Sequence, residues 1–291
     1  MRMMVIVGVV CAARAADARD AVRDEIAELI ADQIEAASDQ SEPDAARAPY
    51  ADGVKIIVTD ATHASNPLLA PTEIRLDRLQ HHAEKGLEVQ LSRDGTTAWA
   101  SVETKVTLAQ YGRDPETHAA VDSTWSQTYR ISDVVTKIGG QWRIVASAWS
   151  EGVDNAKANK AAQARHPPQL AALSGGGKPD PWMEGELIAW KGGGLKTTAA
   201  KKAIVFGSGP GERTTDGPAF RKAWYATWVN HVGIEPPTLA ALAPSGTTGW
   251  VVANITLDKK THKVPFRVFI VFDKDADGNW QLVHAHFATT S

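Results

Sequence analysis

The residues best suited to chemistry lie near the C-terminus, in the segment Trp280–Phe287, which is predicted to be the last strand. Side chains alternate between the two faces of a strand, so every second residue shares a face. One face then carries Trp280, Leu282, His284 and His286. Two imidazoles on one face are suited to proton transfer or metal binding near neutral pH. Partly buried, hydrogen-bonded histidines with a structural role are the alternative.

A metal site needs more ligands than this strand supplies. A catalytic zinc takes three protein ligands, and no third ligand accompanies His284 and His286 at a fixed spacing. The segment Asp273–His284 has Asp at its first, third and fifth positions and Gly at its sixth, like a calcium loop. Its twelfth position, which should be Glu, is His284. We therefore predict an acidic hairpin turn, with no metal and no cofactor.

Composition restricts the possible partners. The chain has 291 residues, 43% hydrophobic and 22% charged, which fits about two globular domains. The formal net charge of −3 gives no basic surface for nucleic acid. No apolar run reaches the roughly 18 residues that a membrane-spanning helix needs. We predict neither nucleic-acid binding nor a membrane span.

Residues 1–15 have the order of a short signal peptide. Arg2 precedes an apolar stretch, and Ala13-Arg14-Ala15 fits a small-residue cleavage site. Cleavage would place the protein outside the cytoplasm, secreted or periplasmic. A buried first helix in a cytoplasmic protein is the alternative.

Periodicity predicts helices followed by strands. Residues 22, 26, 29, 30 and 34 are apolar at helical spacing, which indicates an amphipathic helix after residue 17. A β-branched strand is expected at Val54–Thr59 and a helix from about Thr72 to Lys85. Strands then follow up to Trp149, and the polar segment Asp154–Pro181 is predicted to be a partly helical linker. After this linker the order recurs, with helices in 181–191 and 218–230 and strands in 203–208, 246–257, 265–274 and 279–287.

The chain contains an internal repeat. The phrase GTTAWASVETKVTL at Gly95–Leu108 returns as GTTGWVVANITLDK at Gly246–Lys259. Further landmarks follow in the same order, and one loop between residues 108 and 128 is longer in the first copy. The matched pairs are Trp99 with Trp250, Arg130 with Arg267, Lys137 with Lys274, and Trp142 with Trp280. We predict a domain duplication with domains at 17–152 and 181–291 and a linker at 153–180.

Each half resembles the nuclear transport factor 2-like superfamily, which includes ketosteroid isomerases and SnoaL-like polyketide cyclases. The second half carries the resemblance best, through GSGPGE at Gly207–Glu212, Gly249-Trp250, FRV at Phe266–Val268 and WQLVHAHF at Trp280–Phe287. The resemblance implies an α+β fold of two tandem cone-shaped domains, each a curved antiparallel sheet wrapped around helices. It also implies a pocket for a small apolar ligand, and pairing of the two domains as an intramolecular pseudo-dimer.

This implied pocket gives the histidines a possible role. In an isomerase or cyclase mechanism, His284 or His286 would be the general base and Arg267 the donor to a developing enolate. The matching positions of the first half are Ala146 and Ala148. Ketosteroid isomerases use an Asp base with a Tyr and a second Asp as donors. No set of residues here matches them, although Tyr129 and Asp133 share a strand face.

The remaining candidates are aromatic and charged residues of the repeated strands. Tryptophans line pockets or pack sheets. Glu103 is expected opposite Arg130, as a ligand-binding pair or as an ordinary cross-strand ion pair. The candidate ligand-binding residues are therefore Trp99, Trp142, Trp250, Trp280, Arg130 and Glu103.

Three functions follow from these residues. The first is a non-catalytic tandem module that binds a small apolar molecule or a protein partner. The second is an isomerase- or cyclase-type enzyme with a histidine base in the second domain. The third is an interaction scaffold whose pockets are filled by its own side chains. An open apolar cavity distinguishes the first two from the third.

Overall fold

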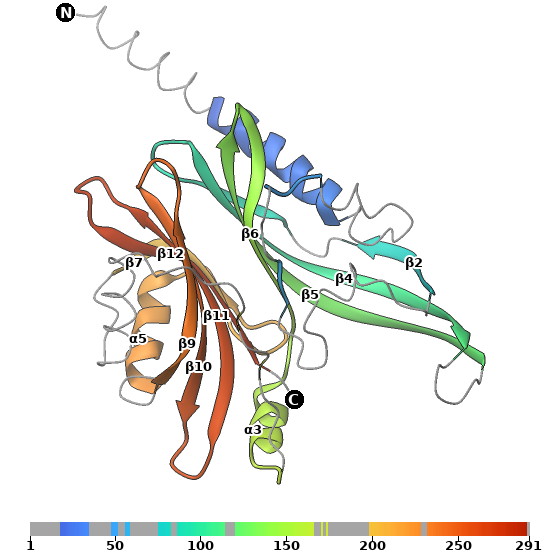
Figure 1. Cartoon of the computed structure of the whole chain (residues 1–291). Coiled ribbons are helices and arrows are strands. Elements are labelled where there is room, and N and C mark those ends of the chain that lie inside the picture. The colour runs from blue at the N-terminus through green and yellow to red at the C-terminus, as the bar shows by residue number, and fades with distance from the viewer. Residues whose placement is uncertain are drawn as a thin grey trace, which may run out of the picture.

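The computed structural model describes two six-stranded sheets that face each other (Figure 1). We refer to residues 18–151 as the N-terminal half and to residues 198–289 as the C-terminal half. Among the described residues, no helix is both long and apolar enough to cross a membrane. The structure describes residues 18–34, 48–51, 56–58, 75–82, 86–113, 120–165, 170, 173, 198–227 and 232–289.

The sheet of the N-terminal half has the order β1-β6-β5-β4-β2, with β3 also paired to β4. All of its pairs are antiparallel except β1 with β6. The strands are β1 (Ile56–Val58), β2 (Arg75–His82), β3 (Glu88–Leu91), β4 (Thr97–Arg113), β5 (Ala120–Ile138) and β6 (Gln141–Glu151).

The sheet of the C-terminal half has the order β8-β7-β12-β11-β10-β9. Its one parallel pair is β7 with β12. Helix α3 (Asn155–Ala162) precedes this sheet in sequence, and α5 (Gly217–Thr227) lies between β8 and β9. The strands are β7 (Thr198–Phe206), β8 (Arg213–Thr214), β9 (Val232–Leu242), β10 (Thr248–Asp258), β11 (Lys263–Lys274) and β12 (Trp280–Thr289).

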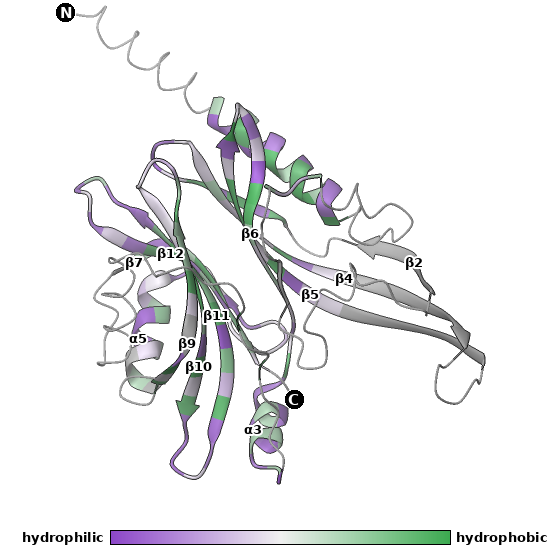
Figure 2. Cartoon of the chain, viewed as in Figure 1, coloured by the Kyte–Doolittle hydropathy of each residue, from purple (hydrophilic) through white to green (hydrophobic). Residues whose placement is uncertain are grey.

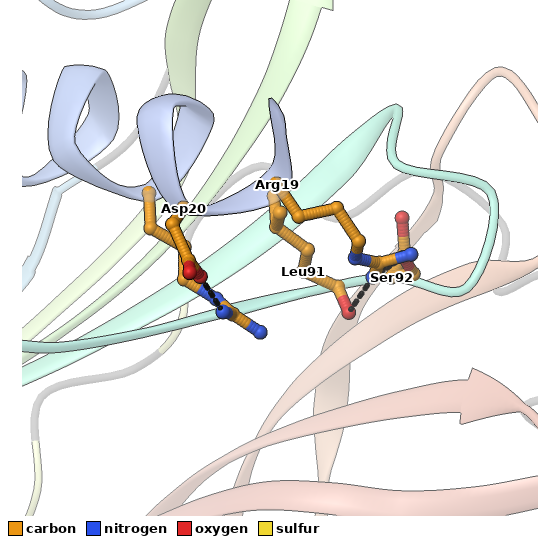
Figure 3. A network of polar contacts seen from close by, with 5 residues as sticks. Arg19, Asp20, Leu91 and Ser92 are labelled. Carbon is orange, nitrogen blue, oxygen red and sulfur yellow. Dashed lines mark hydrogen bonds and ion pairs between the residues drawn. The ribbon is translucent and has the colours of Figure 1, made fainter. Parts of the chain in front are cut away.

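The N-terminal helix, residues 18–34, covers the outer face of the first sheet. Ile26, Ile30 and Ile34 are buried against that sheet, as their helical spacing predicts. The Arg19 guanidinium donates to the carbonyl oxygens of Ser92, at 3.0 Å, and Leu91, at 3.5 Å (Figure 3). The helix is therefore fixed both by apolar packing and by bonds to the β3–β4 turn.

Helix α5 covers the outer face of the second sheet. Trp224 is buried and Phe220 is packed against the same apolar cluster. Ala158 and Ala162 of α3 join this cluster, so the helix that follows the first sheet packs on the second. Figure 2 shows hydrophobic residues along the middle of the strands and hydrophilic residues at the hairpin tips.

The inner faces of the two sheets pack against each other and form a third apolar cluster. The order of layers is thus helix, sheet, sheet, helix (Figure 1). The buried members of this cluster are Trp99, Val134, Ala146, Ala148, Leu173, Val252, Phe269, Val271 and Val283.

Three predictions about elements were wrong. The helix predicted at about 72–85 contains strand β2, since pairing with β4 from Arg75↔Tyr111 to His82↔Lys105 overrides local propensity. The extra residues between 108 and 128 do not form only a loop, because β4 and β5 stay paired up to Arg113↔Ala120. Strand β9 was not predicted, since Pro236 and Pro237 interrupt the strand pattern, and it lies at a sheet edge, where proline is tolerated.

The other described elements agree with the sequence. The N-terminal helix, the repeated hairpins and the helix in the linker all occur where the periodicity placed them. The acidic hairpin turn is confirmed, because Asp275 accepts backbone N–H bonds from Asp277 and Asn279, both at 2.9 Å. The predicted helix at 181–191 and the possible signal peptide lie outside the described residues.

Candidate functional site

A pocket of about 360 Å³ opens on the C-terminal half, between its sheet and α5. Its volume is in the range of small-molecule sites. It has an aromatic floor and a polar wall, and the wall is formed mainly by the β7–β8 connection. The pocket is lined by Asn155, Val205, Gly207, Ser208, Glu212, Arg213, Thr214, Phe220, Trp224, Phe266 and Phe287.

The aromatic floor is held by the helix period. Phe220 and Trp224 are four residues apart on α5, so both face the sheet. The Phe287 ring lies 5.9 Å from the Phe220 ring and 5.5 Å from the Trp224 ring, centroid to centroid. These separations are typical of favourable aromatic pairs. The floor therefore offers a rigid surface for an apolar ligand.

The polar wall depends on glycine. The Glu212 carboxylate folds back over its own loop and accepts a bond from the Gly209 N–H at 2.8 Å. A Cβ atom at Gly207 would lie 2.4 Å from Oε2 of Glu212, so a side chain at 207 would displace the carboxylate. Asn155 completes the wall, with Nδ2 donating to Glu212 at 2.6 Å and Oδ1 accepting from the Ser208 hydroxyl at 2.9 Å.

His284 and His286 lie between the two sheets and do not line this pocket. Their relative exposures are 0% and 2%. Ring nitrogens of His286 lie 2.9 Å from the Ser132 hydroxyl and 2.6 Å from the Ser150 hydroxyl. Nε2 of His284 lies 2.8 Å from the same Ser132 hydroxyl. The two histidines of one half thus bind two serines of the other half.

This burial determines the charge of the histidines. Desolvation lowers the pKa of His284 to about 3, and desolvation together with the nearby Arg130 charge lowers the pKa of His286 well below its usual value. Both imidazoles are therefore neutral at physiological pH. Nε of Arg267 donates to Asn254 at 3.0 Å, and Arg267 does not line the pocket. The structure does not place the three together at a ligand cavity.

The predicted ligand-binding residues occupy three different environments. Trp99 and Trp250 lie at the packed inner faces, and Trp99 donates to Gln90 at 3.0 Å. Trp142 is in the apolar core of the N-terminal half, and Trp280 is packed on that of the C-terminal half. None of the four lines the 360 Å³ pocket, but Trp99 lines a second groove, of about 640 Å³, between the N-terminal helix and β3.

Glu103 and Arg130 are opposite each other in the register of β4 and β5, as predicted. The buried Arg130 guanidinium, however, donates to backbone carbonyl oxygens of the C-terminal half, including that of Ser208 at 2.9 Å. Burial lowers the pKa of Arg130 to about 10, and the Glu103 charge opposes this effect. Arg130 is therefore charged at neutral pH and reaches the rear of the pocket wall.

The interior of the N-terminal half contains a buried acid. Asp133 is 1% exposed, and no described residue donates a hydrogen bond of normal geometry to its carboxyl oxygens. Desolvation raises its pKa to about 7. Nearby, Gln33 donates to the Tyr50 hydroxyl, and Trp149 Nε1 donates to the Ser147 hydroxyl at 2.9 Å.

The sequence indicated Asp133 only as a neighbour of Tyr129 on a strand face, and it did not indicate Phe220 and Trp224 as a pocket floor. The signal for the floor was present, because PAFRKAW places two aromatic residues one helical turn apart. Within the described ranges, no group of three or more His, Cys, Asp or Glu side chains is arranged to hold a metal ion.

Comparison with family models identifies the segment that contains the pocket. Residues 194–290 match the family model described as a SnoaL-like domain. The C-terminal half is therefore similar to a SnoaL-like domain over this segment. It contributes every lining residue of the pocket except Asn155, which begins α3. The structure as a whole is α+β, with mostly antiparallel sheets and few helices.

Several solved structures are similar to part of the chain. An NTF2-like superfamily protein from Salmonella enterica is 17% identical over 47% of this chain and 94% of its own, with a TM-score of 0.35. An NTF2-like protein of unknown function from Pseudomonas putida is 21% identical over 47% and 92%, with a TM-score of 0.29. A ketosteroid isomerase-like protein from Erwinia carotovora is 13% identical over 45% and 97%, with a TM-score of 0.29. No curated protein matches the sequence.

Proposed function

We propose that the protein is a non-catalytic binding module whose C-terminal SnoaL-like domain holds a small apolar molecule. The pocket of about 360 Å³ with its floor of Phe220, Trp224 and Phe287 is the observation that carries this proposal. The polar groups of the wall bond mainly to one another, as Asn155, Ser208 and Glu212 do. An apolar ligand can therefore bind without breaking the hydrogen bonds of these polar groups, which keeps the desolvation cost of binding low.

We further propose that the two halves arose by duplication, with domains at 17–152 and 181–291 joined by a linker at 153–180. Equivalent strands support this. Both sheets have one parallel pair, and the last hairpin of each has a register shift at matching places, Val134/Val135 and Val271/Phe272. The turns match too, since Gly95 and Gly246 have φ of 71° and 68°.

The packing of the two inner faces supports the proposal of an intramolecular pseudo-dimer. A covalently joined partner is present at high effective concentration, so the pair forms without a second chain. Export by a signal peptide at 1–15 stays a prediction, because these residues lie outside the described part of the chain.

The alternative, an enzyme with a histidine base, is not favoured by the geometry. A general base must reach the proton that it removes from a ligand. His284 and His286 are instead enclosed by Ser132, Ser150 and the rings of Phe206 and Phe269. The filled-scaffold hypothesis is disfavoured by the open pocket.

Fluorescence titration with 1-aminoanthracene, a neutral aromatic dye that brightens in apolar surroundings, tests the proposed function. We expect saturable binding by the wild-type chain. Thr214→Trp, which places a large ring at the pocket rim, should weaken binding at least tenfold. Arg213 and Glu212 stay unchanged in this variant, so the charge of the wall is preserved.

The matched control uses a second hollow among the described residues. That groove, of about 640 Å³, lies between the N-terminal helix and β3 and includes Ala27 and Leu91. Ala27→Trp should leave dye binding within about twofold of wild type. Loss of binding in Ala27→Trp but not in Thr214→Trp would overturn the proposal, as would the absence of saturable binding by the folded wild-type chain.

A further inference from the structure

The N-terminal half contacts the wall of the pocket on the side away from the cavity. Loop 207–212 connects β7 to β8 and lines the pocket through Gly207, Ser208 and Glu212. The Arg130 side chain, from β5 of the N-terminal half, crosses the interface and ends at the rear of this loop. Its nitrogens donate to three successive carbonyl oxygens, those of residues 207, 208 and 209.

Arg130 suits this role chemically. A guanidinium presents its donors in a rigid, planar fork, so one side chain satisfies several acceptors at once. Nη2 lies 2.9 Å from the Ser208 oxygen and 3.1 Å from the Glu151 oxygen, and Nη1 lies 3.2 Å from the Gly209 oxygen. Arg130 itself is only 1% exposed, so these carbonyl oxygens compensate a buried charge. The loop and the charge stabilise each other.

Residues that follow the first sheet add to the same wall. The Val153 N–H donates to the Ser208 oxygen at 2.9 Å, and Asn155 bonds both Ser208 and Glu212. Loop 207–212 is therefore hydrogen-bonded both to β5 of the N-terminal half and to the segment 153–155 that follows the first sheet. Gly207 and Gly209 allow this close packing, because a Cβ atom at either position would clash with the Glu212 carboxylate.

We infer that Arg130 is a positioning residue for the pocket, and that ligand binding in the C-terminal half is coupled to the docking of the N-terminal half. This inference rests on the proposed function of the pocket and adds a regulatory consequence to it. Whatever loosens the interface frees loop 207–212 and opens the pocket wall. By reciprocity, a ligand that orders the wall also strengthens the interface.

Arg130→Met tests this inference, because it keeps much of the side-chain volume and removes the donors. Arg93→Met is the matched control. Arg93 also crosses the interface and donates to carbonyl oxygens, those of Asp275 at 3.1 Å and Ala276 at 3.0 Å, but it does not touch the pocket. Both variants lose an arginine that joins the halves, and only one loses support of the wall.

We expect Arg130→Met to raise the dissociation constant of 1-aminoanthracene about tenfold, and Arg93→Met to change it less than twofold. Amide hydrogen exchange should accelerate at residues 207–212 in Arg130→Met only, and dye should slow it in the wild type. Arg130→Lys keeps the charge without the fork and should show the same pattern more weakly, which covers the case in which Arg130→Met does not fold.

The outcomes separate the two proposals. If the wild type binds no dye but exchange at 207–212 still rises in Arg130→Met, the proposed ligand function fails and the positioning role holds. If the wild type binds dye and both arginine variants bind it equally well, with unchanged exchange at 207–212, the positioning role is overturned.

Discussion

The interiors of the two halves differ although their sheets share the order of four strands, β1-β6-β5-β4 in the first and β7-β12-β11-β10 in the second. Beneath the first sheet, the N-terminal helix packs Ile26, Ile30 and Ile34 into the core, and the 640 Å³ groove between this helix and β3 is not lined by these three residues. Beneath the second, α5 contributes Phe220 and Trp224 and leaves a pocket. The first interior encloses an acid, Asp133, whereas the second is floored by aromatic rings.

The two halves thus differ in where they leave room for a ligand. Ile26, Ile30 and Ile34 fill the buried face under the N-terminal helix, whereas Phe220 and Trp224 of α5 line a pocket. The inner faces differ in the same way, since Ala146 and Ala148 stand at the places of His284 and His286. Small residues on one face accommodate large ones on the other.

The largest expected effect concerns the packed interior. Ile30→Ala should lower the free energy of unfolding by about 3 kcal/mol, because it leaves a cavity among fully buried side chains. Phe220→Ala, at the floor of the open pocket, should cost about half as much and also weaken dye binding. Chemical denaturation measures both values. Equal costs would contradict the contrast between a filled and an open interior.

The buried acid of the N-terminal half should give stability a distinctive pH dependence. The pKa of Asp133 is raised to about 7 in the folded state, above its ordinary value of about 3.9. The folded state therefore binds the extra proton, and this contribution to stability is lost as pH rises from about 4 through 7.

Asp133→Asn cannot ionise and should remove this dependence. Relative to wild type, the variant should gain up to about 1.4 kcal/mol per pH unit between pH 4 and 7. Denaturation at a series of pH values checks it. A stability difference between the two proteins that does not vary with pH would show that Asp133 ionises normally in the fold.

The histidines at the interface should give stability a pH dependence opposite to that of Asp133. The pKa of His284 is lowered to about 3 in the folded state, below the ordinary value of about 6.5. The unfolded state therefore binds the extra proton, and stability is lost as pH falls from about 6.5 toward 3. His284→Leu should stay within about 1 kcal/mol of wild type at pH 7.5, since Ser132 keeps its bond to His286.

At pH 5 the same variant should be more stable than wild type by about 1 to 2 kcal/mol, because it has no imidazole to protonate at that position. The measurement is made on the Asp133→Asn variant, which keeps both histidines. If this variant retains full stability down to pH 4, the neutral, buried state of the imidazoles is contradicted.

The smallest expected effect tests the equivalence of the two halves. Lys137 lies 5.2 Å from the centre of the Trp142 ring, and Lys274 lies 4.8 Å from that of Trp280. Lys137→Met and Lys274→Met should each cost about 0.5 kcal/mol, since both are cation–π pairs near the surface. Costs that differ by more than about 1 kcal/mol would argue against equivalent environments at these repeated positions.

Regular periodicity made most of the described fold predictable. The period of Ile26, Ile30 and Ile34 fixed the buried face of a helix, and the repeated GTT turns located two matching hairpins. The β2 segment was predicted as a helix from its local sequence alone. Its structure is determined by pairing with β4, which the local sequence does not reveal. Pairing across a sheet is not encoded within a short window of sequence.

The candidate site was less predictable for a related reason. Strand alternation predicts Trp280, Leu282, His284 and His286 on one face, but a register shift between Leu282 and His284 puts Trp280 and Leu282 on the α5 side and the histidines toward the other sheet. Alternation also does not tell whether the face of His284 and His286 meets the ligand or the other sheet. In this molecule their face meets the other sheet, and Ser132 and Ser150 are more than a hundred residues away in sequence. The support of the pocket wall by Arg130 is equally non-local.

Xenon binding in pressurised crystals tests the contrast between the two interiors most directly, because xenon occupies accessible apolar cavities without needing a specific ligand. The account predicts xenon density among Phe220, Trp224 and Phe287, and none among Ile26, Ile30 and Ile34. Xenon beneath the N-terminal helix, with none beside α5, would contradict it.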